Sequence, residues 1–304
     1  MKALVISGGG SKGAFAGGIT EFLLKECQEH YDILVGTSTG SLMIPLIALG
    51  KIDLLKEIYT SVTNKDIFSV YPFIIKKSKG TIKTSINHFG IIRQYLKKQK
   101  SFGDSRPLRE LIERMFTYED FMTLKKGKLE IIVTVSNLSM EEVEYKSLKK
   151  CSYKDFCDWM WISANMTPFM SLVNKNGYQY ADGGIGNLVP IRKAIKKRAT
   201  QIDVIVLKPL NVPKHKRPVG NAFSLILNML GFMHNQLSLN DITIGQLEES
   251  LHEDVIIHFY YTPKVLTDNA LIFEPKQMKL WWELGYEHAK KFDPQYCRLI
   301  KHQR

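Results

Sequence analysis

The stretch DILVGTSTGSLM, residues 32–43, joins two apolar runs through Gly36, Ser38 and Gly40. Residues 32–35 predict a buried strand, and the apolar run after Gly40 predicts a helix. A GxSxG sequence at such a bend holds its serine on a tight turn, where the flanking glycines relieve crowding. Ser38 is therefore either a turn residue or an exposed nucleophile, and the rest of the chain must decide between the two.

A glycine-rich loop precedes this stretch. GGGSKGAFAGG, residues 8–18, follows a first apolar run at residues 2–7 and leads into a helix predicted for residues 14–29. Three consecutive glycines let the backbone turn sharply with several N–H groups exposed, and the helix directs its positive end to the same place. The loop is thus an anion site, suited to a phosphate or to a transient oxyanion.

The two predicted strands and the helix between them form a βαβ unit. Because its strands are parallel, the glycine loop and Ser38 leave the sheet at the same edge. Neighbouring strands stand about 4.8 Å apart, or about 10 Å with one strand between them. We therefore expect the N–H groups of Gly9 and Gly10 within reach of the Ser38 hydroxyl.

The glycine loop also supports an alternative function. Gly8, Gly10 and Gly13 fit GxGxxG, the dinucleotide-binding pattern, at the appropriate place in a βαβ unit. That pattern needs an acidic residue at the end of the second strand, which holds the ribose. Here Asp32 begins the strand, and Gly36 follows its end. A nucleotide-binding α/β enzyme is therefore the disfavoured alternative.

A serine nucleophile needs a base within hydrogen-bond distance. The order Ser38, Asp182, His288 would imitate an α/β-hydrolase triad, but His288 lies inside a predicted helix, and no histidine adjoins a glycine turn at a strand end. Asp182 follows a strand predicted at residues 177–181. Asp-Gly is a turn signal by itself, whereas a strand end brings the carboxylate to the edge where loops carry active sites. Partial burial would raise its basicity above that of an ordinary carboxylate, whose pKa is about 3.9.

Three blocks together resemble the signature blocks of the patatin-like phospholipases, in the same order. They are Gly8-Gly9-Gly10-Ser11-Lys12-Gly13, Gly36-Thr37-Ser38-Thr39-Gly40 and Asp182-Gly183-Gly184. Residues 163–190 are also similar to the family, whereas residues 61–127 resemble it only loosely. The resemblance implies a serine–aspartate dyad in place of a triad, with Ser38 as nucleophile and Asp182 as proton acceptor.

The resemblance also implies the rest of the site. The oxyanion hole would come from the first block, which holds Gly8, Gly9, Gly10, Lys12 and Gly13, while Gly36, Gly40, Gly183 and Gly184 support the motifs. The implied substrate is a phospholipid or lysophospholipid, cleaved at a fatty-acyl ester. Neither a metal nor a cofactor is required.

The other predicted elements continue an α/β alternation. Strands are predicted at residues 129–135, 142–148, 203–207 and 255–261, and helices at residues 106–116, 153–164, 191–198 and 275–291. No repeat or linker divides the chain, so we expect one α/β domain over residues 1–304, with the motifs within residues 1–210 and a helical and strand extension at residues 211–304. The expected architecture is a three-layer α/β/α sandwich around a mostly parallel sheet.

The net charge of +12, from 42 Lys and Arg against 30 Asp and Glu, implies an anionic partner, either nucleic acid or an acidic lipid surface. Residues 61–100 are basic with interleaved apolar residues and contain one acidic residue, Asp66. They predict either a solvated face or, within an insertion at residues 61–127, a basic cap that meets an anionic membrane. Their aromatic residues form no evident stacking platform, so no nucleic acid is expected. A non-catalytic basic membrane-binding module is a further alternative.

No apolar run approaches the roughly 18–20 residues of a membrane span. Residues 2–7 predict a strand and not a signal peptide. We therefore expect a cytoplasmic protein that associates with membranes peripherally. The four cysteines show no CxxC pairing, which predicts reduced thiols and no metal site. The apolar stretch at residues 221–239, preceded by basic residues 214–217, predicts a helix that packs on the sheet rather than a lid.

Overall fold

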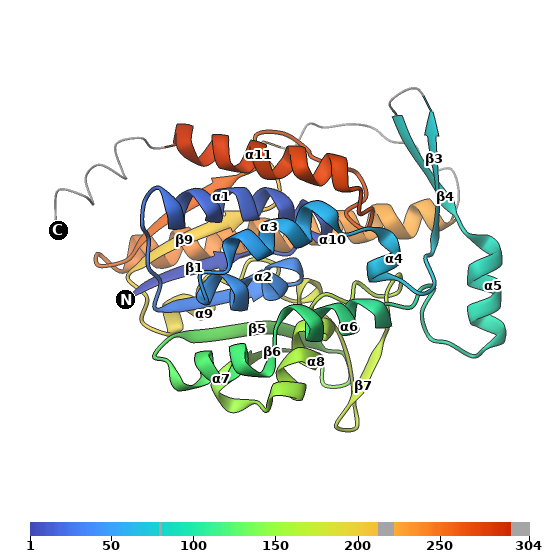
Figure 1. The fold of residues 1–304 in the computed structure, drawn as a ribbon, viewed down its shortest axis with the longest axis horizontal. Coiled ribbons are helices and arrows are strands. Elements are labelled where there is room, and N and C mark those ends of the chain that lie inside the picture. Colours follow the sequence, from blue (N-terminus) through green and yellow to red (C-terminus); the bar gives the residue numbers. More distant parts are fainter. Residues whose placement is uncertain (79–80, 212–221, 293–304) are drawn as a thin grey trace.

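The computed structural model describes residues 1–78, 81–211 and 222–292, arranged around an eight-stranded sheet (Figure 1). The order across the sheet is β10-β9-β1-β2-β5-β8-β7, with β6 paired to β5. The strands are β1 (Lys2–Ile6), β2 (Ile33–Thr37), β5 (Glu130–Asn137), β6 (Glu142–Ser147), β7 (Val173–Lys175), β8 (Tyr178–Asp182), β9 (Gln201–Val206) and β10 (Ile256–Tyr261).

The sheet is mostly parallel and is covered on both faces. β10, β9, β1, β2 and β5 run parallel to one another, whereas β6 and β8 pair antiparallel with β5, and β7 pairs antiparallel with β8. In β1, Leu4 and Ile6 pack into one hydrophobic core while Ala3 and Val5 pack into the other. This alternation is the period of two of a strand buried on both faces.

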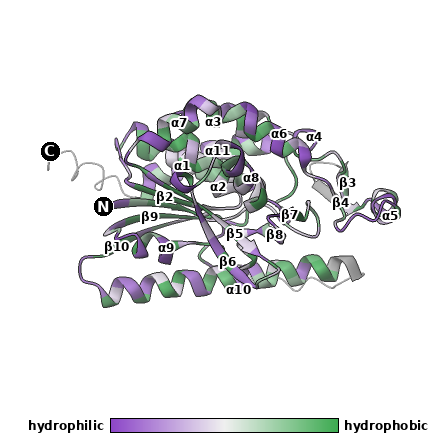
Figure 2. Ribbon diagram, turned by 90° about the horizontal axis from the view of Figure 1, so that it is seen from below, coloured by the Kyte–Doolittle hydropathy of each residue, from purple (hydrophilic) through white to green (hydrophobic). Residues whose placement is uncertain are grey.

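Helices form the outer two layers (Figure 2). The core on one face is filled by α1 (Gly13–Lys25), α2 (Thr39–Ala48), α3 (Ile52–Ser61), α8 (Tyr153–Ser163) and α11 (Pro275–Phe292). The opposite face is covered by α9 (Ile191–Lys196) and the long helix α10 (Ala222–Leu251). The predicted three-layer α/β/α sandwich around a mostly parallel sheet is confirmed.

Residues 61–127 divide into two structurally different parts. The short helix α4 (Asn64–Ile67), the hairpin of β3 (Phe73–Ser78) and β4 (Thr81–Ile86), and α5 (His88–Leu96) come first, and β3, β4 and α5 stand out from one end of the molecule (Figure 1). The helices α6 (Arg106–Met115) and α7 (Tyr118–Lys126) instead bury side chains such as Leu108 and Phe121 in the main core. The protruding part is therefore confined to the first half of the segment.

The stretch at residues 221–239 lies almost entirely within α10, except that Asn221 and the basic residues 214–217 lie outside the described residues. Ile242 of α10 packs in the core, whereas Met229 and Phe232 of its amino-terminal half are exposed. Within the described ranges, no helix has the length and apolar character needed to cross a bilayer.

The expectation of reduced thiols holds for two cysteines. Cys151 and Cys157 are free, but the expectation is wrong for Cys27, which is disulfide-bonded. Spacing along the chain could not reveal this, because a disulfide depends on which parts of the chain the fold brings together. Cys297 lies outside the described residues.

Candidate active site

Ser38 occupies a sharp bend between β2 and α2. β2 ends at Thr37, α2 begins at Thr39, and Ser38 between them has φ 55° and ψ −123°. A non-glycine residue at positive φ is strained, and such strain persists where the surroundings hold it in place. The bend also needs Gly40, because a Cβ atom there would lie 2.3 Å from the backbone oxygen of Ile6.

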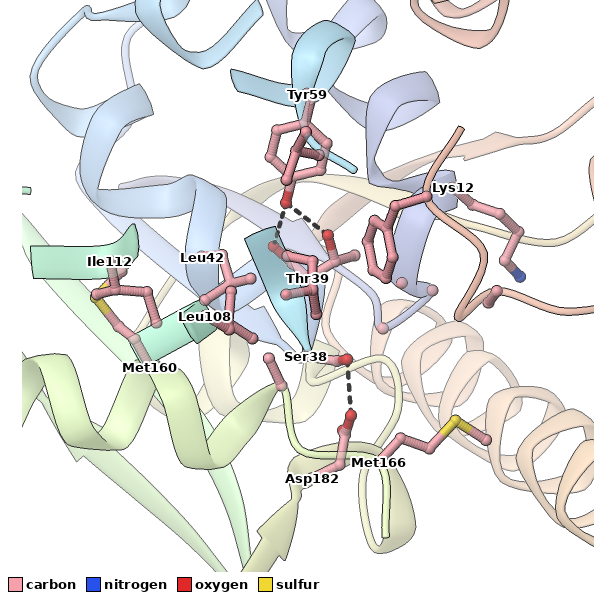
Figure 3. A pocket seen from close by; sticks show the side chains of 18 of the residues that line it. Lys12, Ser38, Thr39, Leu42, Tyr59, Leu108, Ile112, Met160, Met166 and Asp182 are labelled. Carbon is pink, nitrogen blue, oxygen red and sulfur yellow. Dashed lines mark hydrogen bonds between the residues drawn. The ribbon is translucent and has the colours of Figure 1, made fainter. Parts of the chain in front are cut away.

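The Ser38 hydroxyl is hydrogen-bonded to a buried carboxylate. Ser38 Oγ donates to Asp182 Oδ2 at 2.7 Å (Figure 3). Asp182 Oδ1 accepts from the Gly184 N–H at 2.7 Å. Only 8% of Ser38 and 4% of Asp182 is exposed. The Ser38 N–H donates to Ser163 Oγ at 2.9 Å, which further fixes the bend. The serine is thus aimed at a carboxylate that is itself held in place.

The register of three strands explains how these distant residues meet. Thr37 of β2 pairs with Thr134 of β5, and the next residue of β5, Val135, pairs with Asp182 of β8. Asp182 therefore lies at the same level of the sheet as Ser38. β8 runs antiparallel to β5, so the carboxylate reaches this level from the opposite direction along the sheet.

Burial changes the chemistry of Asp182. It raises the pKa of the carboxyl group to about 7, although the hydrogen bonds from Gly184 and Ser38 lower that pKa. A carboxylate with a pKa near 7 is a stronger base than an ordinary aspartate and is still ionised at neutral pH in a large fraction of molecules. Asp182 can therefore accept the Ser38 proton without a histidine.

Two N–H groups of the glycine loop have no acceptor among the described residues. The N–H of Gly8 donates to Leu188, that of Lys12 to Gly9, and that of Gly13 to Gly10. Within the described part of the chain, no acceptor is recorded for the N–H groups of Gly9 and Gly10, and both residues line a pocket with Ser38. The Lys12 ammonium donates to the Leu207 carbonyl oxygen at 2.6 Å. The donors left for an anion are those of Gly9 and Gly10.

Gly10 cannot be replaced by another residue without strain. Its φ is +56°, and a Cβ atom would lie 2.3 Å from the backbone oxygen of Ala270. The same Ala270 oxygen accepts a hydrogen bond from the Ser11 N–H at 2.9 Å. The loop therefore keeps its shape because residues far along the chain close over it.

The pocket at Ser38 is mainly apolar. Its volume is about 190 Å³. Figure 3 shows Leu42 of α2, Leu108 and Ile112 of α6 and Met160 of α8 among the side chains around it. Ser38 and Asp182 supply polar groups at a wall that is otherwise suited to a hydrocarbon chain.

Two further residues of this region were not indicated by the sequence. His234 of α10 lines the pocket, and its pKa is lowered by burial and by the nearby Lys12 charge. Asp241, also on α10, accepts from Asn187 Nδ2 at 2.6 Å and from the Val189 N–H at 2.8 Å, and so anchors the loop that follows Asp182. Neither residue adjoins a glycine turn, and only the packing of α10 brings them here.

His288, the histidine of the triad alternative, packs elsewhere. Its ring lies 5.7 Å from that of Phe15 and 6.3 Å from that of Phe292, between ring centroids. It does not line the Ser38 pocket. Within the described residues, no group of three or more His, Cys, Asp or Glu side chains could hold a metal ion.

The three motif blocks fall inside a region that matches a known family. Residues 4–195 match the family described as patatin-like phospholipase. The chain belongs to this family. Membership in the patatin-like phospholipases supports lipid acyl hydrolase activity, that is, hydrolysis of lipid esters.

The likeness to a solved structure extends beyond residues 4–195. One similar structure is that of VipD from Legionella pneumophila, with a TM-score of 0.55 and 15% sequence identity. The similarity covers 98% of this chain and 67% of VipD. No curated protein sequence matches the chain. The shared fold with VipD therefore includes the carboxyl-terminal elements α10, β10 and α11.

Proposed function

We propose that this patatin-like phospholipase is a serine lipid acyl hydrolase of the phospholipase A or lysophospholipase type, with Ser38 and Asp182 as its catalytic dyad. The observation that carries the proposal is the 2.7 Å hydrogen bond between the two side chains at the wall of an apolar pocket. The raised pKa of Asp182 supports its role as a base, and the N–H groups of Gly9 and Gly10 support an oxyanion hole.

The reaction has two steps. Asp182 accepts the Ser38 proton while Ser38 Oγ attacks the acyl carbonyl carbon, and the Gly9 and Gly10 N–H groups stabilise the negative oxygen. Asp182 then returns the proton to the departing alcohol oxygen as the acyl–oxygen bond breaks. Water, deprotonated by Asp182, then attacks the acyl-serine, and Asp182 returns the proton to Ser38 Oγ as the acyl–oxygen bond breaks and the fatty acid is released. Loss of one oxyanion donor typically costs about 3 kcal/mol of transition-state stabilisation.

The substrate is proposed to lie in an anionic membrane that the protein binds peripherally. The net charge of +12 supports this, because each basic residue near an anionic bilayer contributes about 1 kcal/mol. The two alternatives make different predictions. A nucleotide-binding enzyme would bind nucleotides and tolerate Ser38→Ala, and a non-catalytic membrane module would bind vesicles without releasing any product.

Product analysis tests the proposal. From vesicles of a phosphatidylglycerol that carries two different acyl chains, a phospholipase A should release free fatty acid and lysophospholipid in equal initial amounts. A lysophospholipase should release fatty acid from lysophosphatidylglycerol. Mass spectrometry resolves the products. Ser38→Ala should yield neither product. Diacylglycerol, or equal product from the variant, would contradict a serine acyl hydrolase.

The pocket also predicts a limit on acyl-chain length. Leu42 and Leu46 line it one and two turns of α2 beyond Ser38, so Leu46 lies about 12 Å along the helix from the nucleophile. Leu46→Phe should reduce hydrolysis of a C12 p-nitrophenyl ester roughly tenfold relative to a C4 ester. The matched control is Ile47→Phe, since Ile47 is equally buried on the same helix but does not line the pocket. An equal change of the C12/C4 ratio in both variants would show that the acyl chain lies elsewhere.

A further inference from the structure

Helix α5 presents its apolar side chains to solvent and its polar side chain to the protein. Phe89 and Leu96 are 81% and 74% exposed, and Ile92 and Tyr95 are exposed as well, whereas Gln94 is only 6% exposed. At about 100° per residue, the buried positions 90 and 94 lie on one side of the helix and residues 89, 92, 95 and 96 on the other. Helices of soluble proteins usually bury their apolar side, so the arrangement of apolar and polar side chains on α5 is the reverse of the usual one.

Basic residues lie along one flank of this apolar face and after the end of the helix. Arg93, Lys97, Lys98 and Lys100 are all exposed, and none has an ion-pair partner within the residues that the structure describes. No Asp or Glu occurs between Asp66 and Asp104 in the sequence. An apolar face with basic and no acidic residues beside it complements the acyl region and the negative headgroups of an anionic bilayer.

Hydrogen bonds at both ends of α5 connect it to segments that line the Ser38 pocket. Asn87 caps the helix and donates to the Tyr71 carbonyl oxygen at 3.2 Å, while the Tyr71 hydroxyl donates to the carbonyl of Leu271, which lines the pocket, at 3.1 Å. After the helix, the Phe102 N–H donates to the Pro168 carbonyl at 2.7 Å, between the lining residues Met166 and Met170.

The position of α5 suits contact with a flat surface. It lies at the end of the molecule toward which the parallel strands carry their carboxyl ends, and it runs across that end rather than along the sheet (Figure 1). In the second view it is again the outermost element at this end, beyond the body of the protein (Figure 2). A bilayer in contact with α5 would therefore lie on the active-site side.

We propose that the outward face of α5, formed by Phe89, Ile92, Tyr95 and Leu96, inserts into the interface of an anionic bilayer and holds the pocket rim against it. This inference rests on the proposed function, since it names how that site meets a bilayer substrate. Insertion buries the four apolar side chains, and the basic residues beside them contact lipid phosphates. A lipid then has a short path from the bilayer to Ser38.

Vesicle flotation tests the proposal in the Ser38→Ala protein, so that binding is measured without hydrolysis. With vesicles of phosphatidylglycerol and phosphatidylcholine, Phe89→Gln/Ile92→Gln/Leu96→Gln should weaken binding by roughly tenfold or more. Arg93→Gln/Lys97→Gln should weaken it about fivefold per charge, and only with phosphatidylglycerol present. The matched control is Leu247→Gln/Leu251→Gln/Leu280→Gln, because Leu251 is 76% exposed and the other two are 57% exposed. These control residues lie on α10 and α11, and the substitutions should leave binding unchanged.

Three results would overturn the proposal. They are unchanged binding by the α5 triple variant, equal loss in the control variant, and a wild-type dimer that the α5 substitutions convert to a monomer. The last would assign the face to a second copy of the chain. Thermal unfolding of each variant separates these results from misfolding. Because binding is measured independently of product release, a failed docking surface leaves the dyad proposal intact, and a failed dyad leaves the binding result intact.

Discussion

Ser38→Ala should reduce fatty-acid release by a factor on the order of 10⁴ or more, because loss of the hydroxyl removes the atom that forms the acyl-enzyme. The measurement is kcat/KM on a soluble p-nitrophenyl ester. Ser41→Ala is the matched control: Ser41 lies three residues after Ser38, in the first turn of α2, and is also buried and hydrogen-bonded, but it does not line the pocket. It should lose no more than about tenfold. Equal losses of kcat/KM in the two variants would mean that packing at the bend between β2 and α2, and not the Ser38 hydroxyl, controls activity.

The strained backbone at Ser38 adds a stability signature. At φ 55° and ψ −123° a side chain is unfavourable by about 1–3 kcal/mol, so glycine should be preferred there. Ser38→Gly should therefore unfold at a higher temperature than Ser38→Ala, the reverse of the usual order within helices and strands. Both variants lack the hydroxyl, so their comparison isolates the backbone. If the alanine variant were the more stable of the two, the bend would be unstrained.

Activity should depend on pH through Asp182. Its pKa of about 7 means that the proton acceptor is lost as the pH falls below neutrality. We expect kcat/KM to decrease about tenfold per pH unit below 7, and to be about a hundredfold below its plateau at pH 5. Asp241, whose pKa burial raises to about 6, is the competing titrating group. The inflection near pH 7 should persist in Asp241→Asn. If it disappeared in that variant, the pH dependence would come from Asp241 and not from Asp182.

The same shift predicts how stability changes with pH. The pKa of Asp182 is raised on folding from about 3.9, so between pH 4 and 7 the folded state holds a proton that the unfolded state has lost. The free energy of unfolding therefore decreases as the pH rises through this window, by an amount on the order of a few kcal/mol. Asp182→Asn removes this dependence. Its melting temperature relative to wild type should rise from pH 5 to pH 8, and a constant difference would contradict the raised pKa.

The sequence indicated the central fold and the residues that meet at Ser38, for physical reasons that can be named. Local patterns predict the strands, the glycine loop and the bend at Ser38, since each depends on a few consecutive residues. That Asp182 lies at the same level of the sheet as Ser38 was harder to predict, because it depends on the antiparallel register of β8 against β5. The acyl-sized pocket depends on how α2, α3, α6 and α8 pack together, which no local pattern specifies.

Other features depend on contacts between remote segments. Asp241 and His234 lie on a helix whose sequence predicts only packing against the sheet, and the fold alone brings them to the site. The basic composition of residues 61–100 was evident, but the outward apolar face of α5 needs the buried positions 90 and 94 to be known. Sequence therefore indicated the chemistry of the site better than its surroundings.

The long stretch of chain between Ser38 and Asp182 has a consequence during protein synthesis. Ser38 and Asp182 are 144 residues apart, and β5, which lies between their strands, must join the sheet before β8 can pair with it. A ribosome-bound chain that has emerged only as far as β5 contains Ser38 and the glycine loop but not Asp182. With the proposed dyad, such a chain lacks its proton acceptor, so we expect ester hydrolysis to begin only after β8 has joined the sheet.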